Sequence, residues 1–302
     1  MMSDFKWSFT LNYNTYQSEI LSLGNDATGN AIQYLNQTSP QGGIQIGGQV
    51  GEPFGVIRGH AHVRDANGDK VLRVRENSAG YSYAHYQRTS NSDNVIGEIN
   101  PDWTGSIRNT LSYKNFDLSF LIDIQQGGDF FSLDTWYGFG TGAYDRSVGL
   151  NHLGNDIRLT IPEGGGKLLD GVILPENAEI NNDGIANVAG TQNTDVMSRY
   201  DYYANPEGWT SIGAPHEMHV HDASFVKLRE LRLGYQFTSK LMEKLLLTDA
   251  SIAFVGRNLW IIHKNAPYTD PEAGISAGNT QGYQTGAYPA VKTYGLSLKL
   301  GF

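Results

Sequence analysis

The sequence contains no cysteine among its 302 residues, so disulfides, cysteine nucleophiles and thiolate metal sites are excluded. Basic residues are also scarce. There are 22 Lys and Arg against 31 Asp and Glu, and the resulting net charge of −9 disfavours nucleic-acid binding. No apolar run approaches the roughly 20 residues that a membrane-spanning helix needs. The first residues lack a basic segment followed by an apolar one, so they encode no signal peptide, and we expect a longer protein to begin upstream.

Strict two-residue alternation of apolar and polar side chains is the strongest pattern that is present. Seven segments share it, the last three more weakly: 5–13, 107–113, 116–124, 294–302, 54–63, 225–237 and 251–260. The pattern predicts at least seven strands of about 9–13 residues. Helical periodicity is almost absent, with at most one turn at 241–245. We therefore expect an all-β, antiparallel fold.

Two architectures contain such strands, a soluble sandwich or barrel and a transmembrane β-barrel. Strand length favours the membrane, because roughly 9–11 residues cross a tilted bilayer. Aromatic residues at the strand ends favour it too, since they form girdles at membrane interfaces. The connections alternate between a tight turn at 114–115 and long loops near 64–102, 127–216 and 263–290. If the C-terminus lies in the periplasm, all three long loops are extracellular.

The longest of these loops, 127–216, is rich in aromatic and acidic residues. It holds ten aromatic residues, and its 12 acidic against 4 basic residues account for −8 of the net charge. Aromatic faces among Asn, Asp and Gln suit sugar rings or peptides, although ordinary packing within the loop is the alternative. The candidate substrate-binding aromatics are Trp136, Tyr137, Tyr144, Tyr202, Tyr203 and Trp209.

Histidines supply the densest set of candidate metal ligands. His216, His219 and His221 lie close to Glu217 and Asp222, and on a strand His219 and His221 would point the same way. A solvated strand end is the favoured interpretation, so we assign no metal and no cofactor. No Ser-His-Asp set and no glycosidase carboxylate pair can be assigned either, so the sequence gives no support for an enzyme and predicts no catalytic residue.

Several ordered motifs resemble the SusC/RagA family of TonB-linked outer-membrane proteins. Those in the second half are Asp222-Ala-Ser-Phe-Val-Lys-Leu-Arg-Glu-Leu231, Gly256-Arg-Asn-Leu-Trp260, Asp270-Pro-Glu272 and Lys292-Thr-Tyr-Gly295 with the terminal Phe302. Those in the first half are Val50-Gly-Glu-Pro-Phe-Gly55, Asn100-Pro-Asp-Trp103, Asn115-Phe-Asp-Leu-Ser119 and Gly127-Gly-Asp129. His221 departs from the family pattern, in which an acidic or aromatic residue is more usual.

This resemblance implies a barrel of about 22 strands around an N-terminal plug. Residues 1–302 would be its C-terminal part, without the plug or the TonB box. The implied function is uptake of oligosaccharide or peptide across the outer membrane of a Gram-negative bacterium. The implied partners are the TonB complex, a SusD-like surface lipoprotein, outer-membrane lipid and the barrel-assembly machinery. The resemblance also assigns an assembly signal to the last strand, carried by Tyr294, Leu296, Leu298, Leu300 and Phe302.

The alternative function is that of a soluble or surface-anchored β-rich module that binds carbohydrate or acts as an adhesin. The two hypotheses differ in what the apolar strand faces contact. A transporter segment would require detergent or lipid, whereas a binding module would be soluble in buffer.

Overall fold

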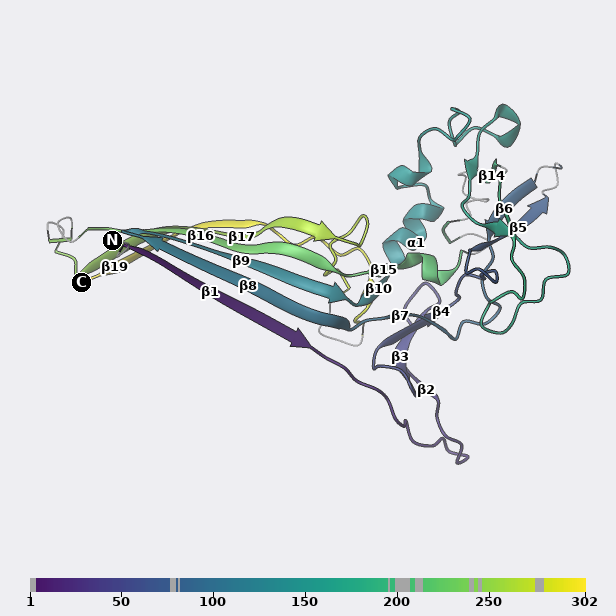
Figure 1. Ribbon diagram of the computed structural model, residues 1–302, viewed down its shortest axis with the longest axis horizontal. Coiled ribbons are helices and arrows are strands. Elements are labelled where there is room, and N and C mark those ends of the chain that lie inside the picture. Colours follow the sequence, from purple (N-terminus) through teal and green to yellow (C-terminus); the bar gives the residue numbers. More distant parts are fainter. Residues whose placement is uncertain are drawn as a thin grey trace.

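The computed structural model describes residues 4–76, 80, 82–194, 196–198, 207–209, 214–238, 242–243, 246–274 and 280–302. A long sheet forms one part of the molecule, and an assembly of loops forms the other (Figure 1). The loop assembly lies at one end of the sheet, and the N- and C-termini lie at the opposite end (Figure 1).

Six antiparallel strands form the long sheet, and each pairs with the next along the chain. In order they are β1 (Phe5–Thr15), β8 (Pro101–Tyr113), β9 (Phe116–Gly127), β16 (Phe225–Gln236), β17 (Asp249–Lys264) and β19 (Thr293–Gly301). The all-β antiparallel prediction is confirmed. The prediction of a long strand at 54–63 is wrong, because Gly55 adopts a φ of +97° and only the short, buried β4 (Val56–Gly59) follows it.

One face of the long sheet is apolar across all six strands. Residues directly opposite one another in the register share a face, and two successive rows contain almost only large apolar side chains. They are Phe5, Tyr113, Phe116, Tyr235, Ile252 and Leu298, and Trp7, Leu111, Leu118, Leu233, Phe254 and Leu296. Much of this face is open, since Trp7 is 65% and Leu296 77% exposed. The face is therefore built to contact something other than this chain's own core.

The opposite face of the sheet is polar and charged. Arg232 pairs with Asp117 across neighbouring strands, and Glu230 accepts from both Arg108 and Arg257 at 3.3 Å. Because alternation places apolar and polar residues on different sides, each strand contributes to both faces at once.

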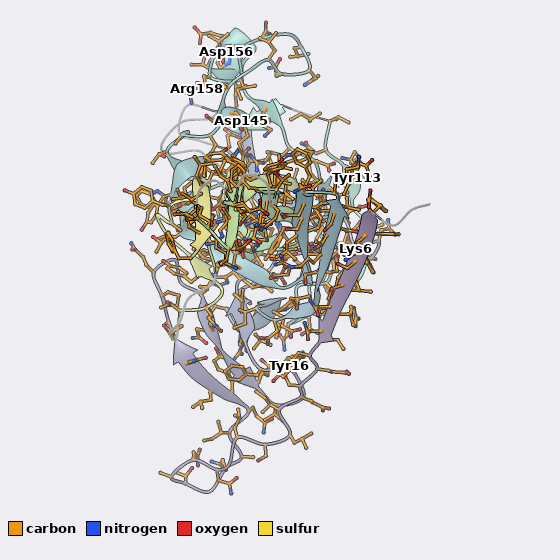
Figure 2. All side chains as sticks on the ribbon, turned by 90° about the vertical axis from the view of Figure 1, so that its left-hand side faces the viewer. Lys6, Tyr16, Tyr113, Asp145, Asp156 and Arg158 are labelled. Atoms are coloured by element: carbon orange, nitrogen blue, oxygen red, sulfur yellow. The ribbon has the colours of Figure 1, made fainter. Side chains whose placement is uncertain are left out.

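The connections between the six strands differ by where they lie. The turn at 114–115 and the described residues of the connection 237–248 lie at the end of the sheet with the termini (Figure 1). The described residues of the connections 16–100, 128–224 and 265–292 lie at the other end (Figure 1). These three long connections form the loop assembly. Seen along the sheet, this assembly extends past both faces, with Asp156 and Arg158 on one side and the chain beyond Tyr16 on the other (Figure 2).

Small sheets join the three long connections to one another. One contains β2 (Tyr34–Thr38), β3 (Gln45–Gln49), β4 and β7 (Asn94–Glu98); a second contains β13 (Thr191–Gln192), β12 (Val172–Ile173), β5 (Val71–Glu76) and β6 (Ser82–Tyr86). A third contains β15 (Val220–Asp222), β10 (Asp129–Ser132) and β18 (Tyr283–Gln284), and β11 (Lys167–Leu168) pairs with β14 (Val196–Ser198). The parallel pairs β5–β12 and β10–β18 each join two different connections.

The main hydrophobic core lies in the loop assembly rather than on the long sheet. Its buried members come from the first two connections: Ile44, Ile46, Ile57, Phe131, Leu133, Trp136 and Ala214. Tyr283 from the third connection stacks on Phe131 with ring centroids 6.2 Å apart. One core thus holds the three loops as a single packed unit.

A short helix, α1 (Leu133–Gly140), follows β10 and was not expected from the sequence. The Ser132 hydroxyl caps it by accepting from the backbone amide of Thr135 at 3.1 Å. In the described part of the chain, no helix is both long and apolar enough to cross a membrane. The expected turn at 241–245 falls largely outside the described residues, which include only 242–243 of it.

Two glycines redirect the chain from the long sheet into the loop assembly. Gly127 and Gly128 have φ angles of +75° and +78°, in the left-handed region that side chains disfavour. A Cβ on Gly128 would also lie 3.1 Å from the carbonyl oxygen of Ile99.

Replacing Gly128 with alanine should therefore lower the free energy of unfolding by about 1–2 kcal/mol. Gly295→Ala is the matched control, because Gly295 has open space around its Cα and an ordinary backbone conformation. Urea unfolding of the protein in detergent would measure both variants. Equal midpoints for the two would contradict the proposed strain at Gly128.

Candidate functional site

The predicted binding aromatics lie in the loop assembly, but they do not form one cluster. Tyr137 on α1 meets Trp209 edge to face, with ring centroids 5.5 Å apart, and its hydroxyl accepts from Gln41 at 2.5 Å. Trp209 is 37% exposed, so part of its ring is available to a ligand. Tyr202 and Tyr203 lie outside the described residues.

Tyr144 belongs to a second aromatic group. Its ring lies 4.3 Å from that of Tyr268 and 5.4 Å from that of Phe139. The Tyr268 hydroxyl donates to Asp145 at 2.7 Å, and the ring of Tyr268 is 43% exposed. Sequence reasoning did not select Tyr268. Its position next to the Asp270-Pro271-Glu272 motif was the only available signal.

Trp136 packs inside the core instead of presenting a surface. It is 9% exposed, and its ring lies 5.1 Å from both His216 and His219. The helical spacing explains the difference, because Trp136 and Tyr137 leave α1 in directions about 100° apart. Trp136 therefore offers little ring surface to a ligand, whereas Trp209, which packs against Tyr137, keeps part of its ring exposed.

The histidines of the 216–221 segment are neutral and at least half-buried rather than solvated, with His216 and His219 fully inside the core. His216 starts the short 3₁₀ helix His216–His219 and accepts from the backbone amide of His60 at 3.1 Å. Nδ1 of His219 and Nε2 of His221 lie 3.1 and 3.2 Å from the Thr135 hydroxyl, so the two imidazoles do meet at one place. Strand alternation is not the reason, because His219 ends the 3₁₀ helix and β15 begins only at Val220. Burial, followed by the charge of Arg146, lowers the pKa of His221 to about 4.

These imidazoles act as packing groups in the described structure. Burial lowers the pKa of His216 to about 3, with further contributions from His60 and Arg88, so its ring is uncharged at neutral pH. Nearby, Glu217 accepts from the backbone amide of His62 at 2.8 Å and pairs with Arg64. Among the described residues, no group of three or more His, Asp or Glu side chains is arranged to hold a metal ion.

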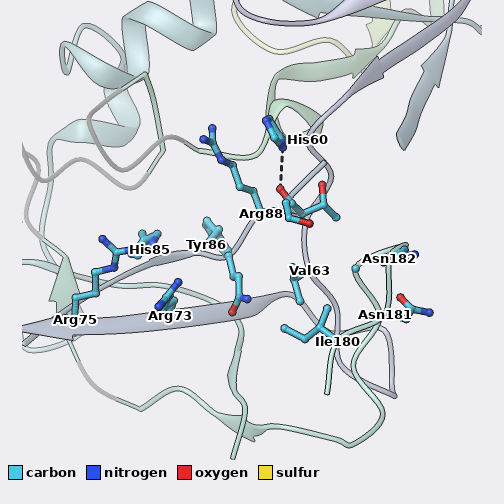
Figure 3. Close-up of a pocket in the computed structure, with 14 residues that line it drawn as sticks. His60, Val63, Arg73, Arg75, His85, Tyr86, Arg88, Ile180, Asn181 and Asn182 are labelled. Atoms are coloured by element: carbon cyan, nitrogen blue, oxygen red, sulfur yellow. Dashed lines mark hydrogen bonds between the residues drawn. The ribbon is translucent and has the colours of Figure 1, made fainter. Parts of the chain in front are cut away.

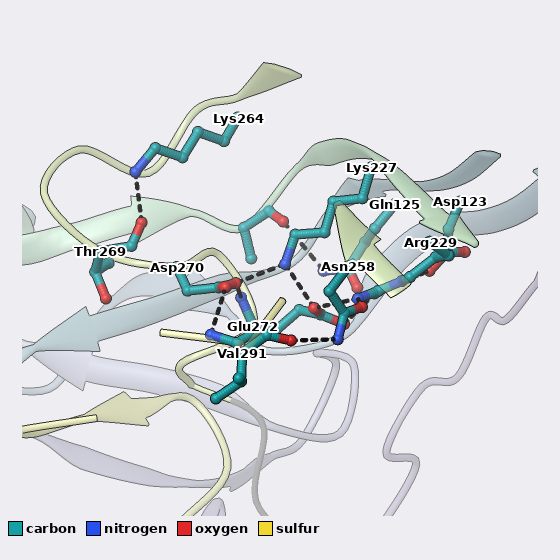
Figure 4. A network of polar contacts seen from close by, with 12 residues as sticks. Asp123, Gln125, Lys227, Arg229, Asn258, Lys264, Thr269, Asp270, Glu272 and Val291 are labelled. Carbon is teal, nitrogen blue, oxygen red and sulfur yellow. Dashed lines mark hydrogen bonds and ion pairs between the residues drawn. The ribbon is translucent and has the colours of Figure 1, made fainter. Parts of the chain in front are cut away.

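A buried ion-pair network connects the third connection to the polar face of the sheet (Figure 4). Lys227 on β16 is only 3% exposed and donates to Asp270 and Glu272, at 2.6 Å each. Arg229 binds both carboxylate oxygens of Glu272 and donates to Asp123 on β9 at 2.6 Å. Each of these charges is buried at least in part and has a partner, which is what a buried ion pair requires.

Asp270 and Glu272 are held as carboxylates by this network. Burial works to raise the pKa of Asp270, but hydrogen bonds from Lys227 and from the backbone amides of Glu272 and Ala290 outweigh it and lower the pKa. Burial also works to raise the pKa of Glu272. Hydrogen bonds from Arg229 and Lys227 outweigh this effect, so the pKa of Glu272 is lowered as well. The stabilisation is therefore present above the ordinary carboxyl pKa and is lost as the pH falls through the lowered values.

The fold and these loops can now be compared with known proteins. No protein-family model matches the sequence. The chain is similar over 99% of its length to two curated proteins of Formosa agariphila, TonB-dependent receptor P3 (25% identity) and TonB-dependent receptor P26 (23% identity). It spans 27% of the length of each receptor. The resemblance to TonB-dependent receptors that the motifs predicted is confirmed.

Solved structures share the fold. The RagAB peptide importer matches 99% of the chain in its open-open state (TM-score 0.55, 16% identity) and in its closed-closed state (TM-score 0.55, 17% identity). The chain covers 27% and 28% of those chains, respectively. The long sheet with loops gathered at one end is thus an arrangement found in solved structures.

Removing the buried ammonium should loosen the third connection. Lys227→Met leaves Asp270 and Glu272 without that partner, which should cost about 3–5 kcal/mol in local stability. Lys299→Met is the matched control, because Lys299 is exposed and lies 3.8 Å from Asp249, a contact that contributes about 1 kcal/mol or less.

Hydrogen exchange of the Glu272 and Ala273 amides would measure this loosening. Lowering the pH from 6 to 3 should accelerate their opening in the parent protein more than in Lys227→Met. Unchanged protection of these amides in Lys227→Met would show that the network does not anchor the connection.

Proposed function

We propose that this chain is part of a TonB-dependent outer-membrane transporter that takes up a nutrient, either oligosaccharide or peptide. The two-faced sheet is the observation that carries the proposal. Its open apolar face suits contact with lipid, and its polar face suits the interior of a barrel that holds water and a plug. The unpaired outer edges of β1 and β19, within the described residues, would then pair with strands supplied by the rest of the protein.

The loop assembly would lie outside the cell, because all three long connections leave the same end of the sheet. We infer that it forms part of the cargo site and that a SusD-like surface lipoprotein covers it. The similarity to the RagAB fold supports this arrangement. The TonB complex would act through a region outside this chain.

The last strand supports a role in assembly. Tyr294, Leu296 and Leu298 lie on one side of β19, opposite Gly256, Phe254 and Ile252 of β17. Leu300 and Phe302 continue the series, and Phe302 is 90% exposed. We propose that the barrel-assembly machinery recognises this strand.

A charge on the apolar face should prevent insertion if that face contacts lipid. Phe120 lies in the middle of β9, opposite Leu231 on β16. Phe120→Arg should destabilise the inserted protein by about 2–4 kcal/mol. Thr110→Arg is the matched control, since Thr110 faces Ser119 on the polar side.

The amount of folded full-length protein in isolated outer membranes would be measured by its heat-modifiable electrophoretic mobility. Normal insertion of Phe120→Arg, or equal losses in both variants, would favour the soluble binding module instead.

A cargo role for the loop aromatics predicts a transport defect without an assembly defect. Trp209→Ala should raise the cargo concentration for half-maximal uptake about three- to tenfold, because a stacking surface is lost. Trp260→Ala serves as control, since Trp260 lies on the long sheet, outside the loop assembly. Depletion of a casein digest and of mixed plant oligosaccharides from the medium would measure uptake. Identical uptake by parent and Trp209→Ala cells would remove Trp209 from the cargo site.

A further inference from the structure

A basic pocket of about 500 Å³ opens beside the β5–β6 hairpin, in the part of the loop assembly farthest from the long sheet (Figures 1 and 3). Its lining includes Arg73, Arg75 and Arg88 together with His60 and His85. No Asp or Glu is among the described residues that line it. In a protein with a net charge of −9, this concentration of positive charge needs a separate explanation.

The hairpin register brings the cationic groups together. Arg73 lies directly opposite His85, and Arg75 projects from the same face two residues further along β5. Glu76 directly follows Arg75 on β5, so its side chain lies on the opposite face of the hairpin. Arg88 reaches the pocket from the chain just beyond β6 (Figure 3).

In the described part of the chain, no carboxylate is paired with any of these three guanidinium groups. Across the described residues, none of them makes an ion pair or a side-chain hydrogen bond, whereas Arg64 and Arg229 each bind a carboxylate. Burial lowers the pKa of His85 to about 4, and the charges of Arg75, Arg73 and Arg88 contribute to the shift, so all three act on the same imidazole. Guanidinium groups stay protonated, so the pocket keeps its positive charge at neutral pH.

Neutral polar groups complete the lining on the side opposite the hairpin (Figure 3). The side-chain oxygen of Asn181 accepts from the backbone amides of Asp183 and Ile185 at 3.0 and 2.8 Å, which leaves its NH₂ group for a ligand. The side-chain amides of Gln87 and Asn182 belong to residues that also line the pocket, and neither side chain has a hydrogen-bond partner among the described residues. Val63 and Ile180 are the aliphatic exceptions in a lining that is otherwise mostly polar.

We propose that this pocket binds an anionic oligosaccharide through its carboxylate or sulfate groups. The planar guanidinium groups of Arg73, Arg75 and Arg88 match such oxyanions in bidentate geometry. The amides of Gln87, Asn181 and Asn182 match sugar hydroxyls, and the shortage of apolar surface disfavours a peptide with hydrophobic side chains. The volume lies within the range of sites that hold small ligands. The proposal goes beyond transport, because binding is measurable without uptake.

Calorimetric titration of the purified full-length protein in low salt would test this site. The probes are trigalacturonate and sucrose octasulfate, with neutral maltotriose, tetraglutamate and sodium sulfate for comparison. At least one of the two anionic sugars should bind, and its affinity should fall as NaCl is added. The Arg73→Gln/Arg75→Gln double variant should weaken binding about a hundredfold, roughly tenfold for each guanidinium removed.

Two further variants keep the test decisive. Lys114→Gln removes one positive charge at the far end of the sheet, as each arginine substitution does in the pocket, and it should change affinity by less than about twofold. Arg88→Lys keeps the charge but removes the planar fork, so it should weaken binding while leaving the circular dichroism spectrum unchanged.

Other outcomes would overturn the proposal. Binding of maltotriose as tight as that of the anionic sugars would show that charge is not recognised. Binding of tetraglutamate at least as tight as that of the sugars would make this an acidic-peptide site. Full displacement by sodium sulfate at matched concentration would reduce it to a simple anion site. Absence of binding by both anionic sugars, or unchanged affinity in the arginine variants, would remove it altogether.

Discussion

The structure depends on a sheet that separates apolar from polar side chains across six strands. Because the side-chain period is two, every strand must supply both faces, and a register shift of one residue would exchange them. The apolar face finds no cover among the described residues, and the main core lies elsewhere, in the loops. The stability of the sheet in this form therefore depends on a cover for that face from outside the described residues, and the proposed function assigns this cover to lipid.

The loop assembly contains about two hundred residues of connection, and contacts between the connections hold them in one arrangement. Parallel pairing of β5 with β12 and of β10 with β18 joins connections that are far apart in sequence. The core around Phe131 then draws on all three connections. Lys227 and Arg229 add an electrostatic attachment to the polar face of the sheet. The loop assembly is thus attached to the long sheet by ion pairs, in addition to the chain connections.

Periodicity predicted the sheet because alternation is a local property that each strand carries by itself. It did not predict α1, whose eight residues are too few for a helical pattern and whose start depends on the Ser132 cap. The composition of the 127–216 loop placed Trp136 among the candidate binding aromatics, although its burial in the core depends on packing with residues such as Ile44 and Ala214. The basic pocket escaped notice for the same reason, since Arg73, Arg88 and Asn181 meet only in the folded chain. The motif Asp270-Pro271-Glu272 was visible in the sequence, but its partners on β16 were not.

Charge is distributed unevenly within the loop assembly, and this gives the assembly a means of discrimination. The segment 127–216 carries −8 of the net charge, yet its residues Ile180, Asn181, Asn182 and Gly184 form one side of the basic pocket. An acidic surrounding repels small anions at long range, and salt screens this repulsion beyond roughly 10 Å. A ligand with a single oxyanion gains little binding free energy at such a site, because repulsion by the surrounding acidic residues offsets its attraction to one guanidinium group. A ligand with several oxyanions at matching spacing engages several guanidinium groups together, so contrast in charge selects for multivalent anions.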